Sequence, residues 1–175
     1  MSVFFAFMMA VFMLASPEIL MLMTTTEYYD AIYSIIPLTL SVFVKIMYLF
    51  AVNQEYFYKK TKIIALGTVV ATISGVVFNC ILLPAFGYIA AAYVDLICKW
   101  ILYIIHTMIV KRMHKQPVVN NWLLIILFIG SSVIGALTLL LKDNIYARAV
   151  VLIILCATIY KPLMLFIKVH RHQRA

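Results

Sequence analysis

Long apolar runs separated by short polar segments dominate the chain. Six such runs cover residues about 3–23, 31–52, 63–83, 89–110, 122–141 and 145–168. A helix rises about 1.5 Å per residue, so about 20 residues cross a hydrocarbon core about 30 Å thick. The pattern therefore predicts an all-α integral membrane protein with about six transmembrane helices in one domain (1–168) and a basic tail at 169–175.

The third and fourth runs are expected to be joined by a tight loop over Leu83–Tyr88. Pro84 lacks an amide hydrogen and is expected to stop the first of these helices, and Gly87 is expected to let the chain turn into the second. A connection this short predicts that the two helices are antiparallel neighbours.

The run at 63–83 also carries small residues spaced by four, at Gly67, Ala71, Gly75 and then Asn79. Small residues let a second transmembrane helix approach closely. We therefore interpret this face mainly as a packing surface.

Charged residues between the runs predict the orientation. The net charge is +8 and most basic residues fall on one side when six helices are drawn: Lys59, Lys60, Lys62, Lys111, Arg112, Lys115, Lys168, Arg171 and Arg174. The opposite side carries Lys142 and Arg148 beside Glu27, Asp30 and Asp143. Because cytoplasmic loops of membrane proteins are rich in Lys and Arg, both termini are expected to be cytoplasmic.

Five ionisable residues lie inside apolar runs: Lys45, Asp95, Lys99, His106 and Lys161. A charge at the bilayer centre costs about 2.5–3.5 kcal/mol on insertion scales, so such residues normally face a bundle interior or a wet cavity. Lys45 and Lys161 lie near cytoplasmic ends, where their side chains can reach the membrane surface instead. Lys45 also shares a polar stripe with Ser34, Ser41 and Tyr48.

Lys99 lies near the middle of its helix, with Asp95 one turn away to neutralise it. A structural ion pair and a substrate-facing role are equally compatible with this spacing. His106 lies on the same sector, and for it a hydrogen bond inside the bundle is favoured over titration near neutral pH.

Several function classes are excluded by what the sequence lacks. It has no Gly-rich phosphate loop, no nucleophile paired with a base and no metal-ligand spacing, so we expect neither an enzyme nor a cofactor. The three cysteines (Cys80, Cys98, Cys156) lie on separate runs and are expected to be small packed side chains. No basic and aromatic residues alternate on a polar surface, so nucleic acid is not an expected partner.

Several segments in order carry a family resemblance: Pro17–Leu20, Tyr28–Ala31, Phe57–Lys62, Asn79 and Leu82–Ala92. Together they resemble the Wzx-type flippases for lipid-linked oligosaccharides, which are relatives of the MATE multidrug transporters. The resemblance covers most of the chain up to about Val110 and corresponds to the C-terminal portion of the family. No Lys or Arg precedes the first run, so the chain is expected to begin inside a larger protein.

The resemblance implies a bacterial cell-membrane protein that moves an isoprenoid-diphosphate-linked oligosaccharide to the outer leaflet for O-antigen or capsule-type polysaccharide biosynthesis. Its site candidates would be Lys99 and Lys45 for charge attraction, Asp95 to tune Lys99, and Asn79 and His106 for hydrogen bonding. Partners would be the lipid-linked substrate, the bilayer, and the missing N-terminal lobe or another copy. A MATE-like drug or ion-coupled exporter fragment and a non-transporting module from a truncated gene remain alternatives.

Overall fold

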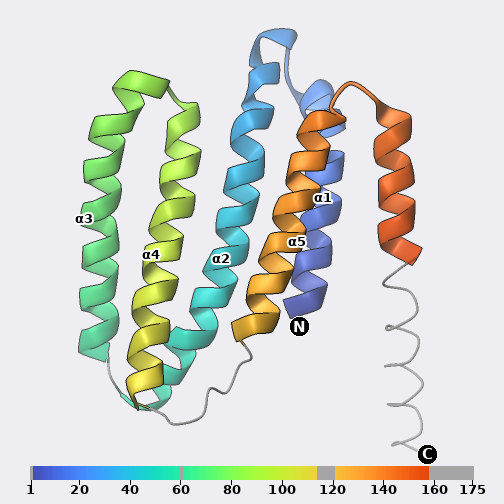
Figure 1. Ribbon diagram of the computed structural model, residues 1–175. Coiled ribbons are helices and arrows are strands. Elements are labelled where there is room, and N and C mark those ends of the chain that lie inside the picture. The colour runs from blue at the N-terminus through green and yellow to red at the C-terminus, as the bar shows by residue number, and fades with distance from the viewer. Residues whose placement is uncertain (1, 60, 114–120, 158–175) are drawn as a thin grey trace, which may run out of the picture.

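The computed structural model describes residues 2–59, 61–113 and 121–157, which fold almost entirely into helices (Figure 1). In chain order these are α1 (Ser2–Met23), the short 3-10 helix η1 (Thr26–Ala31), α2 (Ile32–Phe57), α3 (Thr61–Phe86), α4 (Ile89–Met113) and α5 (Asn121–Leu140), followed by helix Ile145–Ala157. Five of these helices are long and apolar enough to cross a membrane. The prediction of an all-α, multi-pass membrane protein is therefore confirmed.

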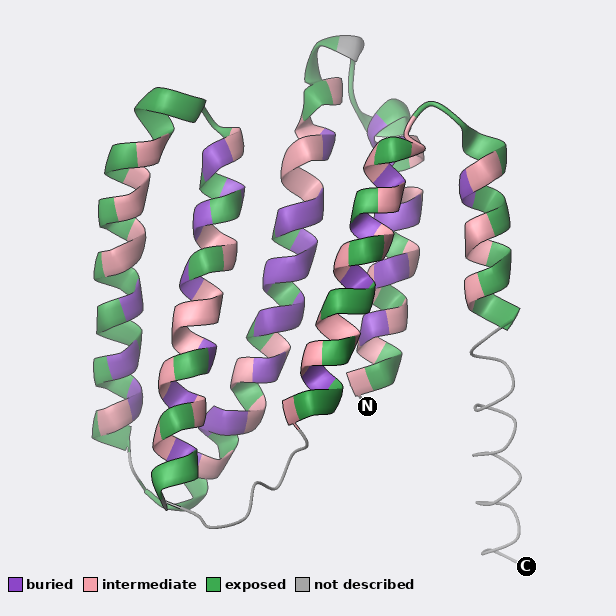
Figure 2. Ribbon diagram, in the orientation of Figure 1, coloured by how far each residue is buried: buried purple, intermediate pink, exposed green. Residues whose placement is uncertain are grey.

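The helices stand side by side, with α2 at the centre of the bundle (Figure 1). On one side α2 packs against α4, and α4 in turn packs against α3, which forms the outer edge. On the other side α2 contacts the neighbouring pair α1 and α5. Figure 2 shows the consequence: buried residues follow the length of α2, whereas α3 is mostly exposed.

Apolar side chains from α1, α2, α4 and α5 form the core. Its main cluster is Ala6, Phe43, Val44, Met47, Tyr103 and Leu124. The ring of Phe128 on α5 stacks on Phe43 and meets Trp100 of α4 edge-on. Aromatic packing thus joins α5 to the α2–α4 pair near the middle of the bundle.

The second helix and the segment before it differ from their predicted bounds. Residues 26–31, expected to lie in a polar loop, form η1. The helix predicted to end at about residue 52 continues to Phe57, because its polar end packs against α4 instead of entering water. The last part of the predicted sixth helix (158–168), with Lys161, and the tail (169–175) lie outside the described residues.

The expectation that Pro84 stops its helix is wrong. α3 continues through Pro84 to Phe86, because proline at this position removes only one intrahelical hydrogen bond and its fixed φ suits a helix. The helix ends at Gly87 instead, where φ is +69° and the amide donates to the carbonyl of Leu83 at 2.9 Å. A glycine in this left-handed conformation is a common helix terminator. The predicted antiparallel pairing of α3 and α4 is confirmed.

A proline also lies inside α1. Pro17 has no amide hydrogen to donate to the carbonyl of Met13, four residues earlier. The hydroxyl of Ser16 donates to that carbonyl at 2.7 Å instead. Both residues are buried, so this local hydrogen bond satisfies a carbonyl that water cannot reach.

Charged residues differ between the two ends of the bundle. Among the described residues, one end, called the basic end below, carries Lys59, Lys62, Lys111 and Arg112, and the N-terminus of α1 lies there (Figure 1). The opposite end carries Glu27, Asp30 and Asp143 together with Lys142. This separation agrees with the charge asymmetry that the sequence predicted.

Candidate functional site

A polar groove runs between α3 and α4 on the outer edge of the bundle. Its volume is about 280 Å³ and its polar lining comes from Thr68, Thr72, Asn79, Asp95 and Lys99. Three of the five site residues expected from the sequence therefore line one groove. The groove lies within the membrane-spanning parts of both helices, so it offers hydrogen-bonding groups at a depth where lipid offers none.

Small residues of α3 shape this groove, as expected. Ala71 and Gly75 line it, and a Cβ atom at Gly75 would lie 3.2 Å from the sulfur of Cys98 on α4. The predicted packing face on α3 is therefore confirmed. The same face also forms one wall of the groove.

Asp95 is the centre of the groove's polar contacts. Its Oδ1 lies 3.2 Å from Lys99 Nζ, one turn further along α4. Its Oδ2 accepts a hydrogen bond of 2.6 Å from the hydroxyl of Ser41 on α2. The Lys99 and Asp95 side chains are 27% and 38% exposed, so the pair faces the groove. The two interpretations left open by the sequence, ion pairing and exposure to a ligand, are thus both compatible with the geometry.

Asn79 also lines the groove, whereas Lys45 lies outside it. The carboxamide oxygen of Asn79 is buried in the groove wall and has no hydrogen-bond partner among the described residues. Lys45 is exposed on α2 and does not line the groove. Its place on the stripe with Ser41 and Tyr48 leaves it beside the α2–α4 contact, without a hydrogen bond or ion pair in the described part of the chain.

His106 lies nearer the basic end, where it bonds to Glu55 of α2. Its Nδ1 is 2.7 Å from Glu55 Oε2, and both side chains are 0% exposed. The Tyr48 ring meets the imidazole edge-on, with ring centroids 5.1 Å apart. The hydrogen-bonding interpretation of His106 is therefore confirmed, with a partner that the sequence did not indicate.

A buried arginine lies towards the opposite end of the bundle. Arg148 of helix Ile145–Ala157 is 5% exposed and forms a bidentate contact with Glu18 of α1, at 2.6 Å and 2.8 Å. Nearby, Lys142 Nζ donates to the hydroxyl of Tyr33 on α2 at 3.1 Å, and this hydrogen bond raises the pKa of Lys142. Both contacts tie the chain after α5 to the first two helices.

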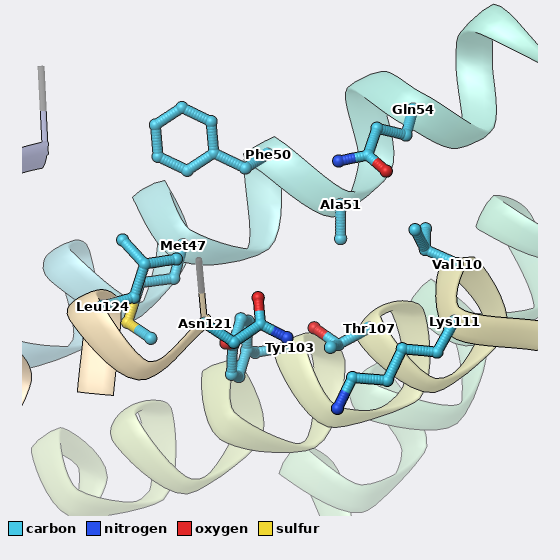
Figure 3. Close-up of a pocket in the computed structure, with 10 residues that line it drawn as sticks. All are labelled: Met47, Phe50, Ala51, Gln54, Tyr103, Thr107, Val110, Lys111, Asn121 and Leu124. Carbon is cyan, nitrogen blue, oxygen red and sulfur yellow. The ribbon is translucent and has the colours of Figure 1, made fainter. Parts of the chain in front are cut away.

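A small cavity lies between α2, α4 and α5 at the basic end (Figure 3). Its polar lining comes from Gln54, Tyr103, Thr107, Lys111 and Asn121, as Figure 3 shows. Its volume of about 20 Å³ is room for about one water molecule. This cavity is too small for an organic ligand. The α3–α4 groove is taken as the candidate site because it brings together three of the residues that the sequence predicted.

Glu55, Glu18 and Arg148 were not among the residues that sequence reasoning selected. Glu55 was placed in a loop after the second run, although it follows Tyr48 by two helical turns on the same stripe. Glu18 is the one charged residue of the first run, which is itself a signal that a cation must pair with it. Arg148 was counted as a charge at the outer surface.

No group of three or more potential metal-ligating side chains occurs within residues 2–59, 61–113 and 121–157. Comparison with known proteins gives no match to a family model, to a curated protein or to a solved structure. The function must therefore be inferred from the fold and the groove.

Proposed function

We propose that this protein is part of a flippase that moves an isoprenoid-diphosphate-linked oligosaccharide across a bacterial cell membrane, with its basic end and both termini in the cytoplasm. The observation that carries the proposal is the polar groove between α3 and α4, which opens at membrane depth on the outer edge of the bundle. A lipid-linked saccharide needs such a surface, because its isoprenoid tail stays in lipid while its head group crosses the apolar core.

The chemistry of the groove favours the saccharide over the diphosphate as the part that it contacts. Lys99 and Asp95 neutralise each other, so the groove has little net charge and instead presents donors and acceptors. Thr68, Thr72 and the unpartnered oxygen of Asn79 add groups that suit sugar hydroxyls. A volume near 280 Å³ is close to the lower end of small-molecule sites, about 300 Å³, which is enough for part of a head group.

Photo-cross-linking tests this proposal directly. The full chain is reconstituted in lipid nanodiscs with an isoprenoid-diphosphate-linked oligosaccharide that carries a photoreactive sugar, and cross-linked peptides are identified by mass spectrometry. We expect cross-links to α3 and α4 around Thr72 and Asn79. Asn79→Leu and Lys99→Met should each reduce the yield about tenfold, equivalent to about 1.4 kcal/mol of binding.

Leu66→Ala is the matched control, because Leu66 is exposed on α3 and does not line the groove. It should leave cross-linking unchanged.

Competition for the cross-linking reaction is a second control. A sugar-free isoprenoid phosphate should not reduce cross-linking, whereas an excess of the unlabelled oligosaccharide lipid should. Competition by organic cations alone would instead support the drug-exporter alternative, in which Asp95 would be the attractive group.

A further inference from the structure

We propose that the small cavity between α2, α4 and α5 at the basic end is a binding site for one structural water molecule, which links these helices by hydrogen bonds. The inference goes beyond the proposed function and does not depend on what the α3–α4 groove carries. It rests on the unpartnered polar atoms in the cavity wall, on the direction of one threonine hydroxyl and on the size of the cavity.

Three buried polar atoms of lining residues have no hydrogen-bond partner among the described residues. They are Gln54 Oε1 from α2 and the hydroxyl oxygens of Tyr103 and Thr107 from α4. Tyr103 is only 5% exposed, so bulk water does not satisfy its hydroxyl. Because a buried polar atom without a partner is unfavourable, three such atoms around one cavity point to a shared partner inside it.

The hydroxyl of Thr107 differs from those of the other threonines beyond the first turn of α2–α5. Those hydroxyls donate to the carbonyl oxygen four residues earlier, at 2.8–2.9 Å: Thr39, Thr68, Thr72 and Thr138. The Thr107 hydroxyl has no such bond among the described residues. In Figure 3 it points from α4 into the space that the Gln54 carboxamide of α2 also faces. The hydroxyl is therefore directed at the cavity and not at its own helix.

The size of the cavity and the kind of atoms around it fit a water molecule. A volume of about 20 Å³ holds about one water, and a buried water typically makes about three hydrogen bonds. Because water both donates and accepts, it can serve all three atoms whichever way each hydroxyl or carboxamide is turned. Asn121 lines the same cavity, so the site also includes α5.

Charge favours water over a metal cation at this site. None of the described lining residues is acidic, and Lys111 lies in the cavity wall. A cation would meet only neutral oxygen atoms and the repulsion of the lysine ammonium group, whereas a neutral water molecule meets no such repulsion.

The position of the cavity gives water a route to it. Lys111 lies in the last turn of α4, and Asn121 is the first residue of α5. Water can therefore enter from the membrane surface without crossing the apolar core. Water-mediated hydrogen bonds are nearly as favourable as direct ones, so the bound molecule serves as a polar link between three helices.

Thr107→Val distinguishes a bound water from a dry cavity, because it replaces the hydroxyl by a methyl group of similar size. In a dry cavity the change removes an unpartnered polar atom and should stabilise the full chain. With a bound water it removes one of the water's hydrogen bonds, and the folding equilibrium constant in detergent should fall about tenfold. A rise in stability would overturn the proposal.

The double variant tests whether two side chains on different helices share one partner. Gln54→Met should also lower the folding constant about tenfold, since it removes a second hydrogen bond. Together with Thr107→Val the loss should be about twentyfold, and not the hundredfold or so of independent changes, because the first substitution already weakens the water. Thr138→Val is the control: this buried hydroxyl bonds within α5, so its effect should add fully to that of Gln54→Met. Full additivity of Gln54→Met with Thr107→Val would contradict a shared water.

Solid-state NMR of the full chain in lipid nanodiscs detects the water itself. Magnetisation should pass from water to the Thr107 methyl group, whose signal is assigned by its loss in Thr107→Val, and should not pass to that of Thr138, which is 0% exposed. Ala51→Val places extra methyl groups in the cavity wall and should abolish the transfer. Absence of transfer to Thr107 in the native chain would overturn the proposal.

Exchange of salts tests for a cation in place of the water. Replacing sodium chloride or potassium chloride by choline chloride at constant ionic strength should leave the unfolding midpoint unchanged. Stability that rises with the concentration of sodium or potassium, and loses this dependence in Thr107→Val, would show that the cavity holds a cation and would overturn the assignment of water.

Discussion

Asp95 and Lys99 lie one turn apart on α4 and neutralise each other within a single helix. Asp95→Asn should destabilise the protein, because it leaves Lys99 without its counter-charge. Adding Lys99→Met should restore most of the loss, since two neutral side chains need no compensation. Unfolding of the four variants in detergent should give a coupling energy of about 0.5–3 kcal/mol. Simple additivity of the two substitutions would show that the pair contributes nothing to stability.

Gly67 and Gly130 give a matched comparison of two glycines in transmembrane helices. Gly67→Ala should destabilise the protein by about 1–3 kcal/mol, because the new methyl group would overlap His106. Nothing lies within 4 Å of a Cβ atom at Gly130, so Gly130→Ala should be neutral or slightly stabilising. Thermal unfolding in detergent measures both. Equal effects would mean that α3 can shift away from His106 at little cost.

Single residues show where sequence reasoning succeeds and where it fails. The Asp95–Lys99 pair could be predicted because both partners lie on one helix, at a fixed spacing of four. The Glu55–His106 pair joins residues that are 51 apart in sequence, so it depends on which helices become neighbours. Periodicity within a helix carries no information about that choice, and a tertiary partner is needed to explain why Glu55 is buried.

At the scale of elements, hydropathy located the five long helices but not all of their ends. The second helix was expected to stop where Asn53 and Gln54 introduce polarity, yet α2 continues because α4 covers the polar turn that follows. Pro84 was expected to break a helix that the glycine three residues later ends instead. In the first case, packing against α4 outweighs the polar residues that were expected to end the helix. In the second, Gly87 ends the helix and Pro84 does not.

The contact between Glu18 and Arg148 predicts the strongest stability effect at this scale, because it joins α1 to helix Ile145–Ala157. Glu18→Gln leaves the buried guanidinium without a carboxylate and should cost about 1.5–3 kcal/mol, the range for hydrogen bonds to charged groups, because the Glu18 side chain is itself 38% exposed. The double variant Glu18→Gln with Arg148→Met should recover much of that loss. Arg148→Lys should not preserve full stability, since an ammonium group cannot make the bidentate contact. Denaturation in detergent compares these variants, and a neutral Glu18→Gln would contradict the argument.

At the scale of the whole molecule, the separation of charges predicts the orientation in the membrane. A reporter inserted at Thr25, beside η1, should be active outside the cytoplasm, and one fused after Ala175 should be active inside it. As a control, a reporter at Lys59, in the turn between α2 and α3, should also report the cytoplasm. Activity of the Thr25 and Lys59 fusions on the same side would contradict the arrangement in Figure 1.

The position of the groove at the edge of the bundle predicts that this chain does not transport by itself. Alternating access requires two bundles that move against each other around a site, and the groove here is open on one side. Residues Met1–Ala175, expressed in cells that lack their own flippase for a matching lipid-linked saccharide, should not restore surface polysaccharide. Recovery of the polysaccharide by a protein that purifies as a monomer would show that a single bundle suffices.

The sequence distance between Glu55 and His106 also has a consequence for how the protein is made. While the ribosome is still synthesising α3, Glu55 has no counterpart, because α4 does not yet exist. We expect the end of α2 to remain among the lipid head groups during this interval and to enter the protein interior only when α4 inserts. Nascent chains halted after α3 should leave Gln54→Cys open to a membrane-impermeant thiol reagent. Chains halted after α4 should protect it, and protection already before α4 would show that α2 finds another cover first.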